Sequence, residues 1–149
     1  MKTNLKALAF ILLVSVLFTA NAQTQISGLE KLAPEIKTGF QKKYPSTSEE
    51  SWSRIDRTIL ISFKTGTEYY DAFFDEKGTW LSTETSILYD QLPQPVRDSL
   101  KSGEFSTWEK GSILKVEYPG AAENYKVYVY SKDWNELEVR FDKSGKRIQ

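Results

Sequence analysis

The stretch Phe74-Asp75-Glu76-Lys77-Gly78-Thr79-Trp80-Leu81 returns 67 residues later as Phe141-Asp142-Lys143-Ser144-Gly145-Lys146-Arg147-Ile148. Each copy places an Asp and a Gly between two strand-like segments, a pattern typical of a tight β-turn. Upstream of each copy, residues 32–36 and 92–96 open a short amphipathic segment. The order of helix then hairpins, found twice, predicts an α+β fold. It would be a tandem repeat of one unit, a helix with a four-stranded antiparallel sheet.

The first 22 residues are typical of a secretory signal peptide. Lys2 and Lys6 precede an apolar run over residues 7–19, and Ala20-Asn21-Ala22 matches a small-residue cleavage site. The run is shorter than the roughly 20 apolar residues that a membrane-spanning helix needs. We therefore expect cleavage after Ala22, a flexible leader over residues 23–28 and no membrane insertion after cleavage. The mature chain is expected to be periplasmic or secreted.

The charge balance argues against nucleic acid as a partner. The chain holds 20 basic and 20 acidic residues. Loss of residues 1–22 removes two lysines and no acid, so the mature chain would carry a net charge near −2. A nearly neutral surface has little long-range attraction for polyphosphate or for anionic lipid.

The sequence contains no cysteine and no histidine, which limits the kinds of catalytic and metal sites that the protein can form. Disulfides, thiol nucleophiles and Ser-His or Cys-His pairs are excluded, and zinc, copper and haem lose their usual ligands. The adjacent acids Glu49 and Glu50 are typical of a solvated segment. Asp75 and Asp142 are more typical of turn residues that accept hydrogen bonds from nearby backbone amides than of calcium ligands. We therefore expect no catalytic residue, no cofactor and no metal site.

Apolar residues recur every four positions in two segments, which predicts one amphipathic helix in each. Proline bounds the first helix, with Pro34 in its first turn and Pro45 after its end. Gly103 is placed as the C-terminal cap of the second helix. The two apolar stripes are Leu32, Ile36, Phe40 and Tyr44 in the first helix and Leu92, Val96 and Leu100 in the second.

Runs of β-branched and aromatic residues predict the strands. They cover residues 59–63, 69–74 and 79–85, then 112–118, 125–130, 136–141 and 146–149. The expected units are residues 29–87 and 88–149, with an insertion in the second unit at residues 118–124. Two isolated units of about 60 residues would each be marginally stable, so we expect them to share buried residues.

Strand alternation assigns the faces of the sheet, because successive side chains point to opposite sides. Tyr69 and Phe73 are expected to face away from the helices. In the strand after each repeated turn, Leu81 and Ile148 are expected to point toward the core. The same alternation predicts that Trp80 and Arg147 face away from the helices.

Several motifs occur together: Leu-Pro-x-x-Val opening a helix, Tyr-Pro at a helix end, a Trp-bearing strand and a Phe-Asp-x-x-Gly-x-Trp-Leu turn. Residues 29–149 thereby resemble the PepSY-like, β-lactamase-inhibitor-protein-like secreted proteins of Bacteroidota. The first copy carries Leu32, Ile36, Phe40, Tyr44-Pro45, Trp52 and residues 74–81; the second carries Leu92-Pro93, Val96, Trp108 and residues 141–145, with Glu104-Phe105 in place of Tyr-Pro. The resemblance implies helices on one side of an antiparallel sheet, a partly open opposite side and no known catalytic residue.

Three functions remain open at this point. The leading hypothesis is a non-catalytic exported binding module that uses the open sheet face to bind a protein or peptide. Its candidate contact residues are Trp80, Tyr69, Phe73, Tyr118 and Arg147. Trp and Tyr are frequent at binding hot spots, but aromatic residues also occur in strands simply because they pack well there. One alternative is an inhibitor of an exported hydrolase, a protease or β-lactamase, that uses the loop at residues 118–124. The other is a glycan-binding protein or a carboxylate-type enzyme.

Overall fold

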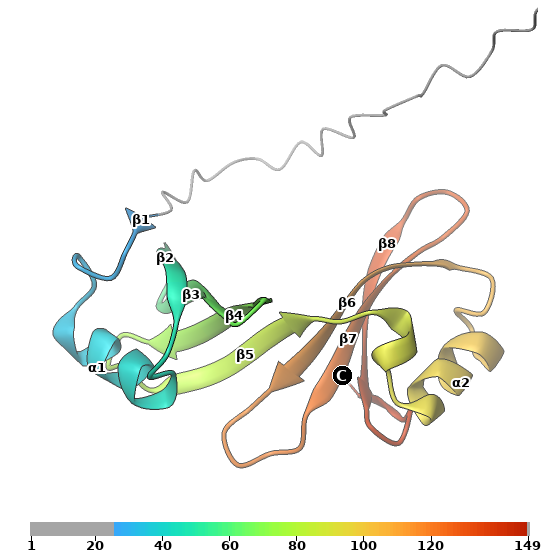
Figure 1. The fold of residues 1–149 in the computed structure, drawn as a ribbon. Coiled ribbons are helices and arrows are strands. Elements are labelled where there is room, and N and C mark those ends of the chain that lie inside the picture. Colours follow the sequence, from blue (N-terminus) through green and yellow to red (C-terminus); the bar gives the residue numbers. More distant parts are fainter. Residues whose placement is uncertain (1–25, 149) are drawn as a thin grey trace, which may run out of the picture.

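The computed structural model describes residues 26–148, so the expected signal peptide and its cleavage site lie outside the described residues. Within this range the fold is α+β, a single antiparallel sheet of nine strands in sequential order with two α-helices (Figure 1). The strands are β1 (Ile26–Ser27), β2 (Ser48–Ile55), β3 (Thr58–Thr65), β4 (Glu68–Asp75), β5 (Trp80–Ser86), β6 (Glu109–Glu117), β7 (Asn124–Tyr130), β8 (Glu136–Asp142) and β9 (Arg147–Ile148). The helices are α1 (Pro34–Lys43), α2 (Gln94–Ser102) and the short 3-10 helix η1 (Tyr89–Gln91).

The two helices begin and end where the sequence predicts. Proline occupies the first turn of both, and α1 ends before Pro45 while Gly103 caps α2. Neither helix within residues 26–148 is long and apolar enough to cross a membrane. The flexible leader expected over residues 23–28 needs one correction, because β1 pairs with β2 through Ile26 and Ser27.

Strand pairing shows that both helices pack on the same face of the sheet. Ile36 and Phe40 of α1 lie in one buried cluster with Ala72 of β4, which pairs with Thr83 of β5. Directly paired residues in antiparallel strands share a face. The pairs Thr85–Lys115 and Lys115–Tyr125 continue this face to the buried cluster around α2. Figure 1 shows α1 and α2 near opposite ends of the sheet, with β5 running between the two halves.

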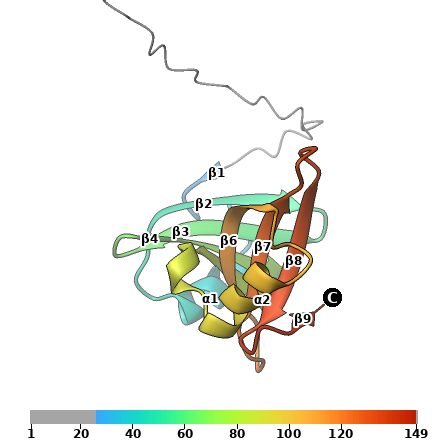
Figure 2. The ribbon, with the colours of Figure 1, turned by 90° about the vertical axis from the view of Figure 1, so that its right-hand side faces the viewer.

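The buried residues form two clusters, and the expectation of a shared core is therefore wrong. One cluster contains Leu32, Ile36, Phe40, Ile59, Ile61, Phe63, Ala72 and Phe74. The other contains Leu92, Val96, Leu100, Phe105, Ile113, Tyr125, Val127, Val129, Val139 and Phe141. The halves are joined instead by backbone pairing of β5 with β6. Figure 2 shows that the strands of the first half cross those of the second at a steep angle, as expected for a twisted sheet.

Each repeated turn lies directly against a helix. Gly78 and Gly145 have φ angles of 80° and 82°, a left-handed conformation that costs little only for glycine. The Asp75 carboxylate accepts hydrogen bonds from the backbone amides of Lys77 and Thr79. Asp142 accepts the corresponding bonds from residues 144 and 146, so the predicted turn chemistry is confirmed in both copies.

The contact between turn and helix leaves no room for a side chain. A Cβ atom on Gly78 would lie 2.2 Å from the carbonyl oxygen of Glu35 in α1. A Cβ atom on Gly39 of the same helix would lie 2.1 Å from the carbonyl oxygen of Gly78. In the second half, Gly145 approaches the Pro95 carbonyl in the same way, and its own carbonyl accepts a 2.8 Å hydrogen bond from Ser99.

The expectation that Trp80 faces away from the helices is wrong. The left-handed Gly78 adds one residue to the turn, so Trp80 pairs with Phe74 and therefore shares its core-facing side. The indole lies under the Lys43 ammonium, which is 3.5 Å from the ring centroid, and donates a 2.8 Å hydrogen bond to Thr83. Leu81, expected to point into the core, lies at the bulge that follows and is 39% exposed.

The same register change applies to the second copy. Arg147 pairs with Phe141 and lies 5.4 Å from the ring centroid of Phe105, with an ion pair to Glu104. Arg147 is therefore also on the helix side, and Ile148 pairs with Arg140 on the opposite face. Neither Trp80 nor Arg147 belongs to the surface that faces away from the helices.

Substitutions of glycine can separate backbone strain from close packing. We expect Gly39→Ala and Gly78→Ala to lower the thermal midpoint by more than Gly66→Ala. Gly66 also has a positive φ, but no atom lies within 4 Å of a Cβ built there. Alanine in a helix normally stabilises by up to about 1 kcal/mol relative to glycine, so a loss at Gly39 would report the clash alone. Thermal unfolding followed by circular dichroism measures these shifts, and a stabilised Gly39→Ala variant would contradict the helix–turn contact.

Candidate functional site

The face of the sheet opposite the helices carries a cluster of paired charges. We call it the helix-free face and define it by residues that share this side through strand pairing: Glu84, Leu114, Val116, Lys126, Tyr128, Glu138 and Arg140. Its centre is Lys126 on β7, whose side chain is only 9% exposed. The Lys126 ammonium forms an ion pair with Glu84 and lies 3.9 Å from a carboxylate oxygen of Glu138.

The position of Lys126 explains why it is buried without a covering layer. Glu84 belongs to β5 and Lys126 to β7, so the lysine side chain must cross β6 to reach its partner. Val116 of β6 pairs with Glu84 on one side and with Asn124 on the other, and it is 1% exposed. The methylene stem of a lysine can cover apolar surface while its ammonium forms polar contacts.

Arg140 and two tyrosines add hydrogen bonds to the ion pairs of Lys126, and we call the whole set of contacts the Lys126 network. The Arg140 guanidinium donates a 2.7 Å hydrogen bond to Glu138 and a 3.4 Å hydrogen bond to the hydroxyl of Tyr118. Tyr128 donates a 3.0 Å hydrogen bond to Glu138 from the other side. Glu138 is therefore held by contacts with three side chains that come from β7 and β8.

These contacts shift the titration of the network. Partial burial alone would raise the pKa of Glu138, but the hydrogen bond from Arg140 and the charge of Lys126 outweigh it and lower the pKa from 4.5. Burial, followed by the hydrogen bond to Glu138, raises the pKa of Tyr128 to about 12. At neutral pH the carboxylate is ionised and the phenol protonated, which suits fixed ion pairing rather than proton transfer.

Three of the five residues predicted to contact a partner lie on the side away from the helices. Tyr69 is 62% exposed and donates a 3.0 Å hydrogen bond to Glu49. Phe73 pairs with Leu60 and Ser82 on the same side. The Tyr118 hydroxyl lies beside the helix-free face, where it accepts a hydrogen bond from Arg140. Trp80 and Arg147 are on the helix side, as described above.

The residues at the centre of the network carried a partial signal in the sequence. Glu136, Glu138 and Arg140 alternate with apolar residues, which predicts that they face away from the core. Nothing in a single strand distinguishes a solvated glutamate from one held by Lys126. Lys126 meets Glu84 across 42 residues of sequence, and this contact depends on the order of β5, β6 and β7.

The turn between β7 and β8 has the same backbone hydrogen bonds as the two glycine turns. The Ser131 amide donates to the Asn135 carbonyl, and the Trp134 amide donates to the Ser131 carbonyl. Trp134 occupies the position of Gly78 and Gly145 with a φ of 60°, and the residue is 74% exposed. A left-handed conformation costs a bulky residue roughly 1–2 kcal/mol relative to the right-handed region.

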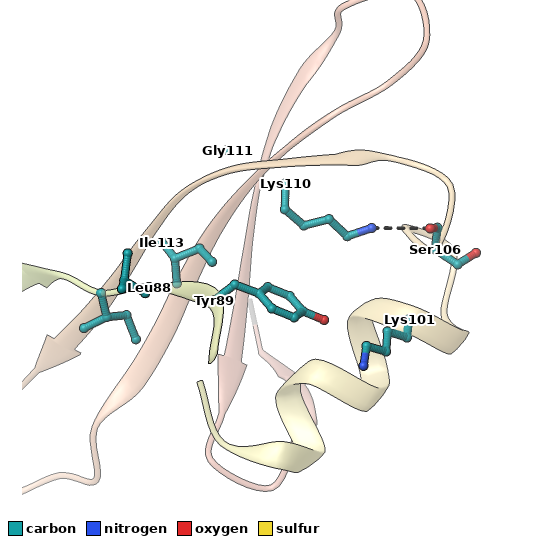
Figure 3. A pocket seen from close by; sticks show the side chains of 8 residues that line it. Leu88, Tyr89, Lys101, Ser106, Lys110, Gly111 and Ile113 are labelled. Atoms are coloured by element: carbon teal, nitrogen blue, oxygen red, sulfur yellow. Dashed lines mark hydrogen bonds between the residues drawn. The ribbon is translucent and has the colours of Figure 1, made fainter. Parts of the chain in front are cut away.

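A pocket lies beside α2, on the helix side. It is a pocket of about 540 Å³ whose lining includes Leu88, Tyr89, Lys101, Lys110 and Ile113 (Figure 3). The Lys110 ammonium donates to the carbonyl oxygens of residues 105, 106 and 108, so its donors hold the loop before β6. Within residues 26–148, no three acidic side chains come together in a way that could hold a metal ion.

Comparison with known proteins identifies the class of protein to which the chain belongs. Residues 59–149 match the family described as "Putative beta-lactamase-inhibitor-like, PepSY-like". The match covers more than half of the chain, so the chain belongs to this PepSY-like family, as the sequence motifs suggested. No curated protein matches the sequence.

Solved structures share the fold at low sequence identity. A DUF2874 family protein from Bacteroides ovatus is similar with a TM-score of 0.72 and 20% identity, over 78% of this chain and 84% of the other. A BLIP-like protein from Bacteroides fragilis gives 0.70 and 19%, over 78% and 83%. A protein from Bacteroides eggerthii, described as a "putative periplasmic" protein, gives 0.71 and 17%, over 78% and 86%. These similarities support the α+β fold.

The lowered pKa of Glu138 predicts a specific dependence of stability on pH. A carboxylate whose pKa is lower in the folded than in the unfolded state stabilises the fold above the unfolded value and loses this contribution as pH falls through the folded pKa. We expect Glu138→Gln to lower the thermal midpoint at pH 7, and the difference from wild type to shrink below pH 4.5. Thermal unfolding between pH 3 and pH 7 measures it.

Glu136→Gln is the matched control for this prediction. Glu136 lies on the same strand and face, and it forms no ion pair among the described residues. A Glu138→Gln effect that persists or grows below pH 4.5, or that Glu136→Gln equals, would contradict the described network.

Proposed function

We propose that this chain is an exported, non-catalytic binding module whose helix-free face binds a protein segment. The observation that carries the proposal is the Lys126 network, which places paired charges and tyrosine rings on the face that neither helix covers. Tyrosine and arginine are the residue types that most often dominate the energy of protein interfaces. Tyr118, Tyr128 and Arg140 are present together on this face.

The internal pairing of the charges supports binding rather than simple solvation. Covering an unpaired charge with a partner would be costly, whereas a charge that already has its partner can be covered at a smaller cost. Glu84, Lys126, Glu138 and Arg140 pair with one another before any partner arrives. A partner could therefore cover the network and obtain its affinity from the tyrosine rings and from Leu114, which pairs with Lys126 on the same face.

We further propose that the chain consists of two copies of one unit, residues 29–87 and 88–149, after a signal peptide over residues 1–22. The matched contacts of Gly78 with α1 and of Gly145 with α2 support this division. Export to the periplasm or beyond is supported by the character of the first 22 residues. The description of the Bacteroides eggerthii neighbour as periplasmic is consistent with it.

Inhibition of an exported hydrolase is a second candidate function. The description of the family and that of the Bacteroides fragilis neighbour both refer to inhibitor likeness. The observation that favours it here is the loop between β6 and β7. Its first residue, Tyr118, joins the helix-free face through Arg140, and residues 119–122 are exposed. Such a loop could enter a cleft while the face rests on the enzyme around it.

Substitution of Tyr128 tests the protein-binding proposal. Mature protein would capture partners from an envelope extract of its own organism, and affinity would then be measured by calorimetry with the purified partner. We expect Tyr128→Ala to weaken binding by about 30-fold, equivalent to loss of about 2 kcal/mol at a hot spot, while the variant stays folded at the temperature of the binding assay.

Lys101→Ala is the matched control, because Lys101 is exposed on the helix side. It should leave the affinity unchanged. Equal affinities for wild type and Tyr128→Ala, or a loss confined to Lys101→Ala, would place the binding surface elsewhere.

A further inference from the structure

Trp134 occupies a place in the chain where stability alone would favour another residue. Two other turns with the same hydrogen bonds carry glycine at the left-handed position, and only this turn carries a bulky residue there. Trp134 is 74% exposed, so burial in the core does not compensate for the conformation. Unfavourable backbone conformations at exposed sites often belong to ligand-binding positions. The β7–β8 hairpin that carries it projects beyond the rest of the sheet (Figures 1 and 2).

The indole of Trp134 forms one wall of a pocket of about 350 Å³, a volume within the range of small-ligand sites. Tyr130 forms a second wall, with its ring centroid 6.5 Å from that of Trp134 and the two planes at 55°. A hydrogen bond of 2.6 Å from the Tyr130 hydroxyl to Glu136 holds the tyrosine in place. The remaining lining residues are polar: Thr107, Glu109, Ser131 and Lys132.

We propose that this pocket binds one or two residues of a neutral saccharide. The C–H groups on the face of a sugar ring carry partial positive charge and are attracted to the negative face of an indole. The hydroxyl groups around the ring need donors and acceptors at its edge, and the side chains of Thr107, Glu109 and Lys132 offer both. Glu109 and Lys132 carry opposite charges, so the pocket has no net charge that would select an acidic or basic ligand.

The side chains lining this pocket indicate binding without cleavage. Hydrolysis of a glycosidic bond generally requires two carboxylates on either side of it, and Glu109 is the only acidic residue that lines the pocket. The nearby Glu136 is engaged by the Tyr130 hydroxyl. The saccharide site is separate from the Lys126 network that carries the proposed function, since Tyr128 and Glu138 form that network two residues further along β7 and β8.

Titration of the Trp134 indole with soluble saccharides tests the proposal. The probes are maltohexaose, cellohexaose, xylohexaose, mannohexaose and chitohexaose, each raised to 10 mM with ¹⁵N-labelled mature protein. The indole N–H signal of Trp134 is assigned by its loss in Trp134→Gly. We expect at least one probe to shift this signal with saturation, and Trp134→Gly to weaken that binding at least ten-fold. The thermal midpoint of Trp134→Gly should be equal to or above that of wild type, because glycine accepts the left-handed conformation.

Tyr69→Ala serves as the control, since Tyr69 is also an exposed aromatic residue but lies on β4 in the other half. It should bind the same probe with unchanged affinity. Absence of a saturating shift with all five probes would overturn the proposal, as would equal binding by Trp134→Gly. If no probe binds and Trp134→Gly instead loses capture of the protein partner, Trp134 belongs to the protein interface and the saccharide proposal is wrong.

Discussion

The packing of both described helices on one face of the sheet is the constraint on which the rest of the structure depends. The apolar stripes of α1 and α2 cover this face in two separate clusters, and each helix is held against its half by a glycine turn. The charged side chains on the opposite face therefore have to find their partners on the strands of the sheet. Lys126 reaches across β6 to Glu84, and Glu138 and Arg140 complete the ion pairing. The face acquires its charges and tyrosines because no helix is available to bury apolar residues there.

The separation of the two clusters also determines how the halves are connected. Contact between them includes the backbone pairing of β5 with β6 and the ion pair of Glu84 with Lys126, which joins a strand of one half to a strand of the other. The same side chains that form the candidate binding surface thus contribute to the contact between the two halves. A partner that covers them would also stabilise this contact, since binding to the folded state alone increases the free energy of unfolding.

Much of the architecture was predictable from periodicity, because it depends on local spacing. Apolar residues at every fourth position predict the two helices, and alternation of apolar and polar residues predicts which strand residues point inward. The inward residues are Ala72, Phe74, Val139 and Phe141, and the repeated Asp and Gly predict the two glycine turns. The outward assignment of Trp80 failed because one left-handed residue in a turn reverses the alternation of the strand that follows it. Lys126 and its partners could not be identified from spacing, since their contacts join three strands. The left-handed position of Trp134 could not be predicted from the sequence either. The residues around it do not resemble an Asp-x-x-Gly turn, although the backbone forms the same hydrogen bonds.

In the proposed mode of binding, a protein partner contacts the face that the helices leave open. Site-specific photo-crosslinking tests it most directly, with a photoreactive phenylalanine analogue at Leu114 or Tyr128 on the helix-free face and at Lys101 or Ser102 on α2. Each labelled protein would be irradiated with the partner, and the covalent product would be measured by gel electrophoresis and mass spectrometry. We expect strong crosslinking from positions 114 and 128 and little from positions 101 and 102. Crosslinking from the α2 positions, with none from the helix-free face, would contradict it.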